Sequence, residues 1–137
     1  MNLHAKLLER EAAGRPVRVG LIGAGKFAAM YLAQVPRTPG VHLAAIADLS
    51  PDNARANLGR VGWPAASFGA ASIDVALKER RTYIGEDWQA LVSHPGIDLV
   101  IEATGHPVAA VEHILGAFRY GKHVVNVTVE ADAFCGP

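Results

Sequence analysis

Residues 17–28 read VRVGLIGAGKFA. The first six form a short, largely β-branched run between Pro16 and Gly23, which is typical of a strand buried on both faces of a parallel sheet. A G-x-G-x-x-A pattern follows over 23–28. Residues 26–35 then place larger side chains at three- and four-residue steps, which predicts a helix over 26–35 that ends at Pro36.

Each small residue of the glycine-rich turn has a physical role. Gly23 permits the tight turn, Gly25 lacks the Cβ that would keep a pyrophosphate from the backbone, and Ala28 lets the helix pack closely on the sheet. The N–H groups at the start of a helix attract phosphates. Asp48 ends the next apolar run 23 positions beyond Gly25, which is near the spacing of about 20 residues expected for the acid that binds the adenine ribose. The pattern therefore predicts a dinucleotide site.

The rest of the chain continues the alternation of strands and helices. We expect strands over 41–47, 82–84, 97–103 and 122–127, and helices from Ser50 to 59 or 62, after Ser72, from Asp87 through Val92 before the Pro95-Gly96 turn, and from Pro107 to Gly121. In the last of these helices, the expected buried stripe is Val108, Val111, Leu115 and Phe118. This order predicts an α/β fold of the Rossmann type, with a doubly wound, mostly parallel sheet, helices on both faces and ligands at the carboxyl ends of the strands.

Composition limits the classes of protein and partner. The chain has 137 residues, 13 Lys+Arg and 13 Asp+Glu, and this balance argues against nucleic acid or an anionic membrane as a partner. We expect a helical segment over 1–15 and one nucleotide-binding domain over 16–137. Cys135, the only cysteine, can form no intramolecular disulfide, and no apolar run could span a bilayer, so a cytoplasmic protein is expected. The six histidines lack metal-ligand spacing, and no metal site is expected.

The residues after two of the expected strands determine the interpretation of the ligand. The Asp48 carboxylate would accept hydrogen bonds from both adenosine ribose hydroxyls and repel a 2′-phosphate, which favours NADH over NADPH. Ser50 and Arg55 could instead receive a 2′-phosphate, and Asp48 could be a turn-forming carboxylate.

Residues 102–107, EATGHP, supply the second set of candidates. Glu102 places a carboxylate in an apolar strand, which is costly unless the group is paired or solvated, so it is a catalytic candidate. Thr104 and Gly105 would lie beside the nicotinamide ribose. His106 begins a helix, where it could face either the nicotinamide ring or solvent.

With these motifs, the chain resembles the N-terminal nucleotide-binding part of homoserine dehydrogenase-like oxidoreductases. Among these it is most similar to the deoxyxylulose phosphate reductoisomerase-like enzymes of bacterial isoprenoid synthesis, which carry a further SAF-type domain. The resemblance runs through VRVGLIGAGKFA, IADLSPDNARANL, DLVIEATGHPVAAVEH and GKHVVNVTVEADAFCGP. It implies an NAD(P)(H) cofactor, NADPH in the reductoisomerase-like members, held by Gly23, Gly25, Lys26, Phe27, Asp48, Thr104 and Gly105. Their neighbours Ala28, Leu49 and Ala103 complete the expected cofactor site.

The chain departs from homoserine dehydrogenases after the GKHVV strand. Val129 stands about where those enzymes carry an active-site lysine, so homoserine is not expected as the substrate. Glu130 is a third catalytic candidate, or simply a carboxylate favoured by a helix N-terminus.

The expected function is hydride transfer between the nicotinamide and a small carbonyl or hydroxy substrate. The substrate-binding groups would come from a further domain, so we expect the chain alone to be inactive. A dinucleotide-sensing regulatory module and an S-adenosylmethionine-dependent methyltransferase are the alternatives. An exposed sheet edge also predicts self-association into a homo-oligomer.

Overall fold

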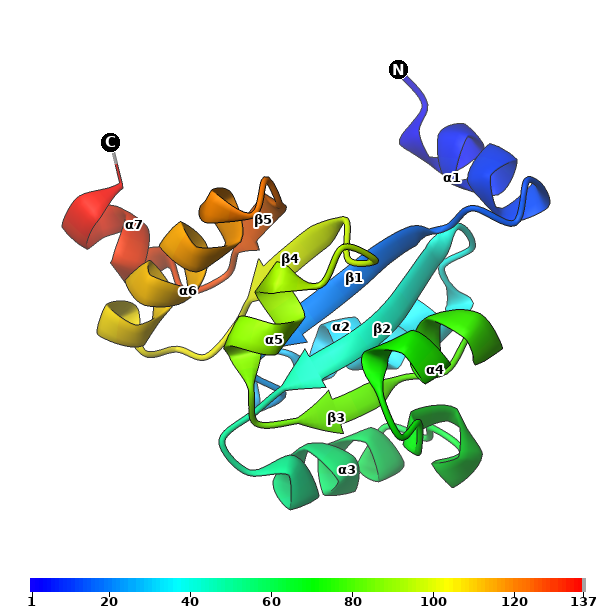
Figure 1. Cartoon of the computed structure of the whole chain (residues 1–137), viewed down its shortest axis with the longest axis horizontal. Coiled ribbons are helices and arrows are strands. Elements are labelled where there is room, and N and C mark those ends of the chain that lie inside the picture. The colour runs from blue at the N-terminus through cyan, green and yellow to red at the C-terminus, as the bar shows by residue number, and fades with distance from the viewer. Residues whose placement is uncertain (137) are drawn as a thin grey trace.

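A computed structural model describes residues 1–136, so Pro137, the last residue of the expected domain, lies outside the described residues. The chain alternates strands and helices along almost its whole length (Figure 1). The elements are α1 Leu3–Ala12, β1 Val17–Ile22, α2 Ala29–Gln34, the 3₁₀ turn η1 Val35–Arg37, β2 Val41–Ala47, α3 Pro51–Arg60, the 3₁₀ turn η2 Ala65–Phe68, α4 Ile73–Glu79, β3 Tyr83–Gly85, α5 Trp88–Ser93, β4 Leu99–Glu102, α6 Pro107–Arg119, β5 His123–Asn126 and α7 Val129–Cys135.

The strands form one parallel sheet in the order β3-β2-β1-β4-β5. Ile22, the last residue of β1, pairs with Ala47 at the end of β2 and with Glu102 at the end of β4. The carboxyl ends of the three central strands are therefore level with one another. The strand order reverses beside β1, and this confirms the Rossmann-type α/β fold.

Two apolar clusters cover the two faces of the sheet. Leu21 of β1 packs with Leu32 of α2 and Leu58 of α3 on one face. On the other face, Ile22 packs with residues from α4, α5 and α6. A Cβ at Gly20 would lie 2.4 Å from a Leu91 methyl carbon, so α5 rests directly on β1. Helices on both faces are thus confirmed.

The helix expected over 26–35 begins later than the sequence suggests. Residues 26–28 form turns, with the Ala28 and Ala29 N–H groups donating to the carbonyls three residues earlier at 3.2 Å, and α2 starts at Ala29. It ends at Gln34, next to η1, which contains Pro36. Phe27 and Met30, which stand at the three- and four-residue steps of that expected helix, are exposed.

The buried stripe expected on α6 was also wrong. Val108 is 76% and Phe118 is 57% exposed, whereas α6 buries Ala110, His113, Gly116 and Ala117. The physical reason is close packing against α5, because a Cβ at Gly116 would lie 2.7 Å from the Trp88 ring. The small residues of α6 therefore form its packed face, and its large apolar residues point outward.

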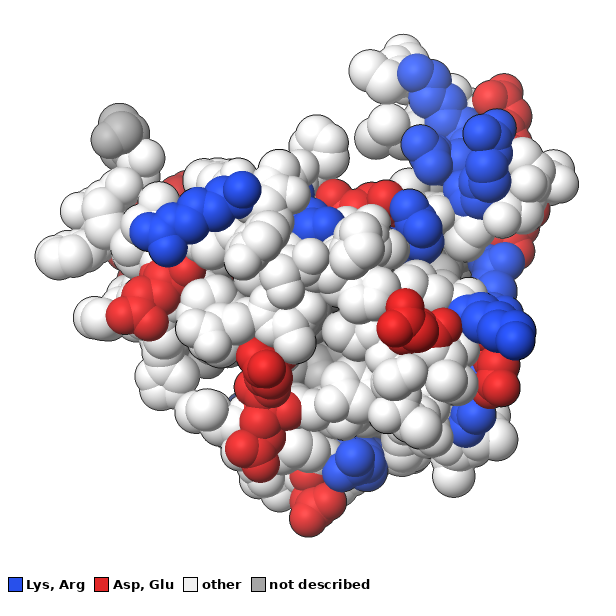
Figure 2. Space-filling model, viewed as in Figure 1, with Lys and Arg blue, Asp and Glu red and all other residues white. Residues whose placement is uncertain are grey.

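Helix α1 projects from the amino-terminal edge of the sheet (Figure 1) and buries none of its residues. Its Glu11 holds it there by accepting hydrogen bonds from the Gly40 N–H at 2.7 Å and from Arg80 at 2.6 Å. Basic side chains gather over α1 at the upper right of Figure 2, and charges of both signs are scattered elsewhere on that face. Among residues 1–136, no helix has the length and apolar character needed to cross a membrane.

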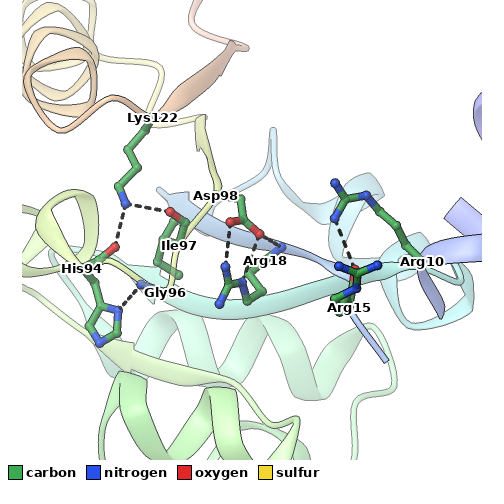
Figure 3. A network of polar contacts seen from close by, with 8 residues as sticks. All are labelled: Arg10, Arg15, Arg18, His94, Gly96, Ile97, Asp98 and Lys122. Atoms are coloured by element: carbon green, nitrogen blue, oxygen red, sulfur yellow. Dashed lines mark hydrogen bonds and ion pairs between the residues drawn. The ribbon is translucent and has the colours of Figure 1, made fainter. Parts of the chain in front are cut away.

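Polar contacts tie the strands together at the same edge (Figure 3). Arg18 of β1 donates from its backbone N–H and its guanidinium to Asp98, at 2.9–3.0 Å. Lys122 donates to the carbonyls of His94 and Ile97, both at 2.7 Å. These contacts lie at the opposite end of β1 and β4 from the glycine-rich turn.

Candidate functional site

A cleft of about 390 Å³ opens at the carboxyl ends of β1, β2 and β4, where ligands bind in sheets of this type. A larger cavity, of about 530 Å³, opens at the other edge of the sheet, beside the start of β2, with Arg37 and Trp63 in its wall. We take the smaller cleft as the candidate site because the glycine-rich turn and Asp48 line it. Its lining residues are Ile22, Gly23, Gly25, Ala47, Asp48, Leu49, Glu86, Trp88, Ala103, Thr104, His106, Ala109, Glu112 and His113.

The two glycines of the turn differ in what surrounds them. Gly23 has a φ of +90°, and a Cβ there would lie 2.8 Å from the Thr104 Cα, so this glycine is required by the fold. A Cβ at Gly25 would meet no protein atom within 4 Å, although Gly25 lines the cleft. Within residues 1–136, the N–H groups of Gly25, Lys26 and Phe27 donate to no protein acceptor. Successive free N–H groups of this kind form an anion-binding concavity.

Asp48 connects the glycine-rich turn to the end of β2. One carboxylate oxygen accepts the Ala24 N–H and the other accepts the Ser50 N–H, each at 2.8 Å. A carboxylate offers about four acceptor positions, so about two stay available to a ligand. Asp48 therefore stabilises the turn, as its alternative role predicts, and it also keeps acceptor positions that a ligand in the cleft could use.

The neighbours of Asp48 separate into residues inside and outside the cleft. Leu49 lines it and is 90% exposed. Ser50 occupies the N-cap position of α3 without a side-chain capping bond. The Arg55 guanidinium donates to Asp52 at 3.1 Å and to the Ile84 carbonyl at 3.5 Å, and Arg55 is not among the lining residues.

Ala103, Thr104 and His106 line the cleft across from the glycine-rich turn, whereas Gly105, between them in the chain, is not among the lining residues. Gly105 has a φ of +73°, and a Cβ there would lie 3.3 Å from the Phe27 ring, so Phe27 and Gly105 are neighbours. Thr104 and His106 line the cleft, and the His106 N–H donates to the Thr104 hydroxyl at 3.2 Å.

Glu102, at the end of β4, is fully buried behind this wall and does not line the cleft. One carboxylate oxygen accepts the Thr104 hydroxyl at 2.6 Å and His113 Nδ1 at 3.1 Å, and the other accepts the Thr128 hydroxyl. Burial by itself raises the pKa of Glu102, but the hydrogen bonds from His113, Thr104 and Thr128 outweigh it and lower the pKa below its usual value. The catalytic candidate is therefore a paired carboxylate with no direct access to a ligand in the cleft.

His113 and Trp88 line the cleft but were absent from the residues expected from the sequence. Their rings meet edge to face at a centroid distance of 4.7 Å. His113 lies two turns into α6, next to Glu112, and no motif or spacing in the sequence marks it as a ligand-binding residue. The need of the buried Glu102 carboxylate for a hydrogen-bond donor was the clue from which His113 could have been identified.

The remaining candidates lie as follows. Lys26 and Phe27 are exposed beside the cleft, Ala28 is buried under the turn, and Ala103 is buried with part of its surface on the cleft. Glu130 is exposed in the first turn of α7 and does not line the cleft. Within the described part of the chain, no group of His, Cys, Asp and Glu is arranged to hold a metal ion.

Comparison with known proteins identifies the family. Residues 17–126 match the GFO/IDH/MocA family model, described as an oxidoreductase family with an NAD-binding Rossmann fold. No curated protein sequence matches the chain significantly.

Solved structures share the fold. A biliverdin reductase from Synechocystis, in complex with biliverdin and NADP⁺, is 31% identical, with 81% of this chain and 29% of that chain covered and a TM-score of 0.53. A homoserine dehydrogenase from Thiobacillus denitrificans is 24% identical, with 87% and 26% covered and a TM-score of 0.62. A myo-inositol dehydrogenase from Lactobacillus casei, in complex with NAD(H) and myo-inositol, is 20% identical, with 81% and 28% covered and a TM-score of 0.58.

The chain therefore spans between a quarter and a third of the length of these solved relatives. The family match covers β1 through β5 and includes every strand of the sheet. The chain belongs to the GFO/IDH/MocA family of oxidoreductases and is an NAD(P)-binding Rossmann domain of that family.

Proposed function

We propose that the cleft at the carboxyl ends of β1, β2 and β4 holds the dinucleotide. The free N–H groups of residues 25–27 would bind the pyrophosphate, and the spare acceptors of Asp48 would bind the adenosine ribose. The turn over 104–106 would then lie beside the nicotinamide half. The observation that carries this proposal is that one cleft is lined both by Gly25, whose N–H is unused, and by Asp48, whose carboxylate keeps unused acceptor positions.

We also propose a preference for NAD(H) over NADP(H). Asp48 lines the cleft, and its negative charge would repel a 2′-phosphate. Arg55, which could have received that phosphate, is engaged by Asp52 and the Ile84 carbonyl. NADPH, which the resemblance to reductoisomerase-like enzymes favours, is the opposing outcome of the binding experiment below.

For the whole protein, we propose an oxidoreductase that acts on a small carbonyl or hydroxy compound. The bound cofactor supplies the hydride or accepts it, and this chain binds and orients the cofactor. Because the solved relatives are about three times as long, we propose that residues 1–15 and 16–137 are an N-terminal helix and a cofactor domain, and that substrate groups come from a further domain. The 137-residue chain would then bind cofactor without turnover, and measurable turnover by this chain would contradict the division.

A finer placement rests on the resemblance alone. The segments EATGHP and VNVTVEAD support kinship with the deoxyxylulose phosphate reductoisomerase-like branch and a role in isoprenoid synthesis. A cytoplasmic location is proposed because Cys135, the lone cysteine, is exposed and free. Activity of the full-length enzyme on deoxyxylulose phosphate, compared with homoserine, would test the branch.

Self-association is proposed at the β5 edge of the sheet. Val125 of β5 and Leu115 and Phe118 of α6 are exposed apolar side chains in this part of the molecule. Sedimentation of the chain over a range of concentrations tests this, and a monomer at every concentration would contradict it.

The decisive experiment for the function is calorimetric titration of the chain with NADH, NADPH and S-adenosylmethionine. We expect NADH to bind with a dissociation constant below millimolar, NADPH to bind more weakly, and S-adenosylmethionine not to bind. Failure of both dinucleotides to bind below millimolar would contradict the proposed cofactor site. Tighter binding of NADPH would contradict only the proposed preference.

A further inference from the structure

The buried carboxylate of Glu102 is the centre of a polar network that reaches the cleft along three routes. The Thr104 hydroxyl donates to Glu102 and accepts the His106 N–H, and the Thr128 hydroxyl donates to Glu102 and accepts the Gly105 N–H at 3.1 Å. These two routes fix the backbone of the cleft wall. The third route is His113, whose Nδ1 lies 3.1 Å from Glu102 and whose ring lines the cleft.

The network determines which nitrogen of His113 carries a proton. An ionised Glu102 can only accept hydrogen bonds, so Nδ1 must carry the hydrogen. In the neutral imidazole, Nε2 then carries the lone pair and is an acceptor. Nε2 has no protein partner among residues 1–136, and it is not among the fully enclosed unpartnered atoms of the structure. An oriented acceptor without a partner is thus present on a ring that lines the cleft.

The position of His113 in the sheet indicates which part of a dinucleotide would meet this acceptor. The strand order places β1 and its glycine-rich turn between β2, which Asp48 follows directly, and β4, which ends at Glu102. If the adenosine ribose lies on Asp48 and the pyrophosphate lies on the turn, the second ribose continues toward β4. The ribose hydroxyls are donors, which is what an Nε2 lone pair requires.

We propose that His113 is a ligand-binding residue of the cleft, whose Nε2 accepts a hydrogen bond from a hydroxyl of the nicotinamide ribose, and that Glu102 is the positioning residue that orients it. This inference rests on the proposed function, because it assumes a dinucleotide in this cleft. The contact with Trp88 and the close packing of Gly116 hold the α6 backbone and the ring in place.

The test uses three ligands that differ in the half of the dinucleotide they contain. ADP has the adenosine and the pyrophosphate, ADP-ribose adds the second ribose, and NADH adds the nicotinamide. His113→Asn keeps an amide donor near the position of Nδ1 and removes the acceptor at Nε2. We expect it to weaken ADP-ribose and NADH about three- to tenfold in calorimetric titrations, which corresponds to one hydrogen bond, and to leave ADP unchanged.

The outcomes distinguish failure of the proposed cofactor site from failure of the inference about His113. If the unmodified chain binds neither ADP nor NADH, the proposed function fails. If it binds both, and His113→Asn changes all three ligands equally or none of them, the inference about His113 fails while the cofactor site stands. His123→Asn is the matched control, because His123 is exposed at the start of β5, away from the cleft, and we expect no change for any ligand.

A measurement on the unmodified chain keeps the test valid if the variant fails to fold. Nitrogen-15 NMR of the imidazoles distinguishes a protonated from an unprotonated Nε2, and the His123→Asn and His106→Asn spectra help to assign the signals. We expect His113 to carry its proton on Nδ1 and its Nε2 signal to move on addition of ADP-ribose but not of ADP. A proton on Nε2 in the free chain, or no movement with ADP-ribose, would overturn the inference.

Discussion

Two strands that flank β1 end in acidic residues with opposite environments. Asp48 follows β2, is partly exposed in the cleft, and accepts two backbone N–H groups. Glu102 ends β4, is fully buried, and accepts three side-chain donors. Both acids lie at the same edge of the same sheet, so their location alone does not separate a ligand-binding acid from a structural one.

The difference is how much of each carboxylate the protein itself uses. The donors around Glu102 belong to the chain, and removing the charge would leave them without an acceptor in a buried place. Around Asp48, and at the free N–H groups of residues 25–27, capacity is left for a ligand. We therefore expect changes on the β4 side to act mainly on stability and changes on the β1 and β2 side to act mainly on cofactor affinity.

The largest expected effect is on the stability of Glu102→Gln. A glutamine has one acceptor oxygen and cannot satisfy His113, Thr104 and Thr128 together, so a buried donor loses its partner. We expect the free energy of unfolding to fall by about 2–4 kcal/mol at pH 7, measured by urea denaturation.

Glu112→Gln is the matched control for that change. Glu112 lines the same cleft from α6 but is exposed, and a surface substitution of this kind is expected to change stability by less than about 0.5 kcal/mol. Equal effects of the two variants would remove the distinction between the two acids.

The next effect concerns affinity and uses the two glycines of the turn. An alanine methyl group at Gly25 would meet no protein atom but would enter the cleft where the ligand must approach. Gly25→Ala should leave the unfolding free energy near its original value and weaken NADH by about 2 kcal/mol, or about 30-fold. Gly23→Ala should instead lower stability, because its methyl would collide with the backbone of residues 103 and 104 at a positive φ. Unchanged NADH affinity in a folded Gly25→Ala protein would contradict the proposed pyrophosphate position.

A smaller and more selective effect is expected at Asp48. Asp48→Asn removes the charge and one set of acceptors, so NADH should bind about tenfold more weakly while NADPH changes by less than about threefold. Asp132→Asn, at an exposed residue of α7 that does not line the cleft, should leave both affinities unchanged. If the ratio of the NADH and NADPH dissociation constants does not change in Asp48→Asn, Asp48 does not determine the preference.

The sequence predicted the parts of this comparison that depend on local pattern. Strands 17–22 and 41–47 have the predicted bounds, and Ser72 caps α4 through the Val75 N–H. The position of Asp48 at the cleft follows from the same alternation of strand and helix. These features depend on residues close together in the chain.

The parts that were missed depend on contacts between distant residues. Glu102 was flagged as a buried charge in need of a partner, but two of its donors lie 11 and 26 positions away. The packed face of α6 was misplaced because Gly116 and Ala117 gain their burial from the Trp88 side of the neighbouring helix and not from their own apolar character. Local hydrophobic pattern gives no information on such packing.

Asp98 offers the sharpest test of whether burial or pairing makes Glu102 important. Like Glu102 it accepts three donor groups, all from Arg18 at the opposite edge of the sheet (Figure 3). Unlike Glu102, its side chain is 37% exposed. If pairing alone determined how much such a carboxylate stabilises the fold, Asp98→Asn would lower the free energy of unfolding as much as Glu102→Gln.

We expect instead a loss of at most about 1 kcal/mol at pH 7, because solvent screens an exposed pair. Partial burial works against ionisation, but the hydrogen bonds from Arg18 outweigh it and lower the pKa of Asp98. A folded-state pKa below the unfolded value near 3.9 makes this contribution present above about pH 4 and lost as the pH falls through the folded-state pKa. Urea denaturation should therefore show a gap between Asp98→Asn and the unmodified chain that is small at pH 7, smaller in high salt, and lost as the pH falls through the lowered pKa of Asp98. A gap as large as that of Glu102→Gln would mean that the number of donors, and not burial, separates the two regions of the molecule.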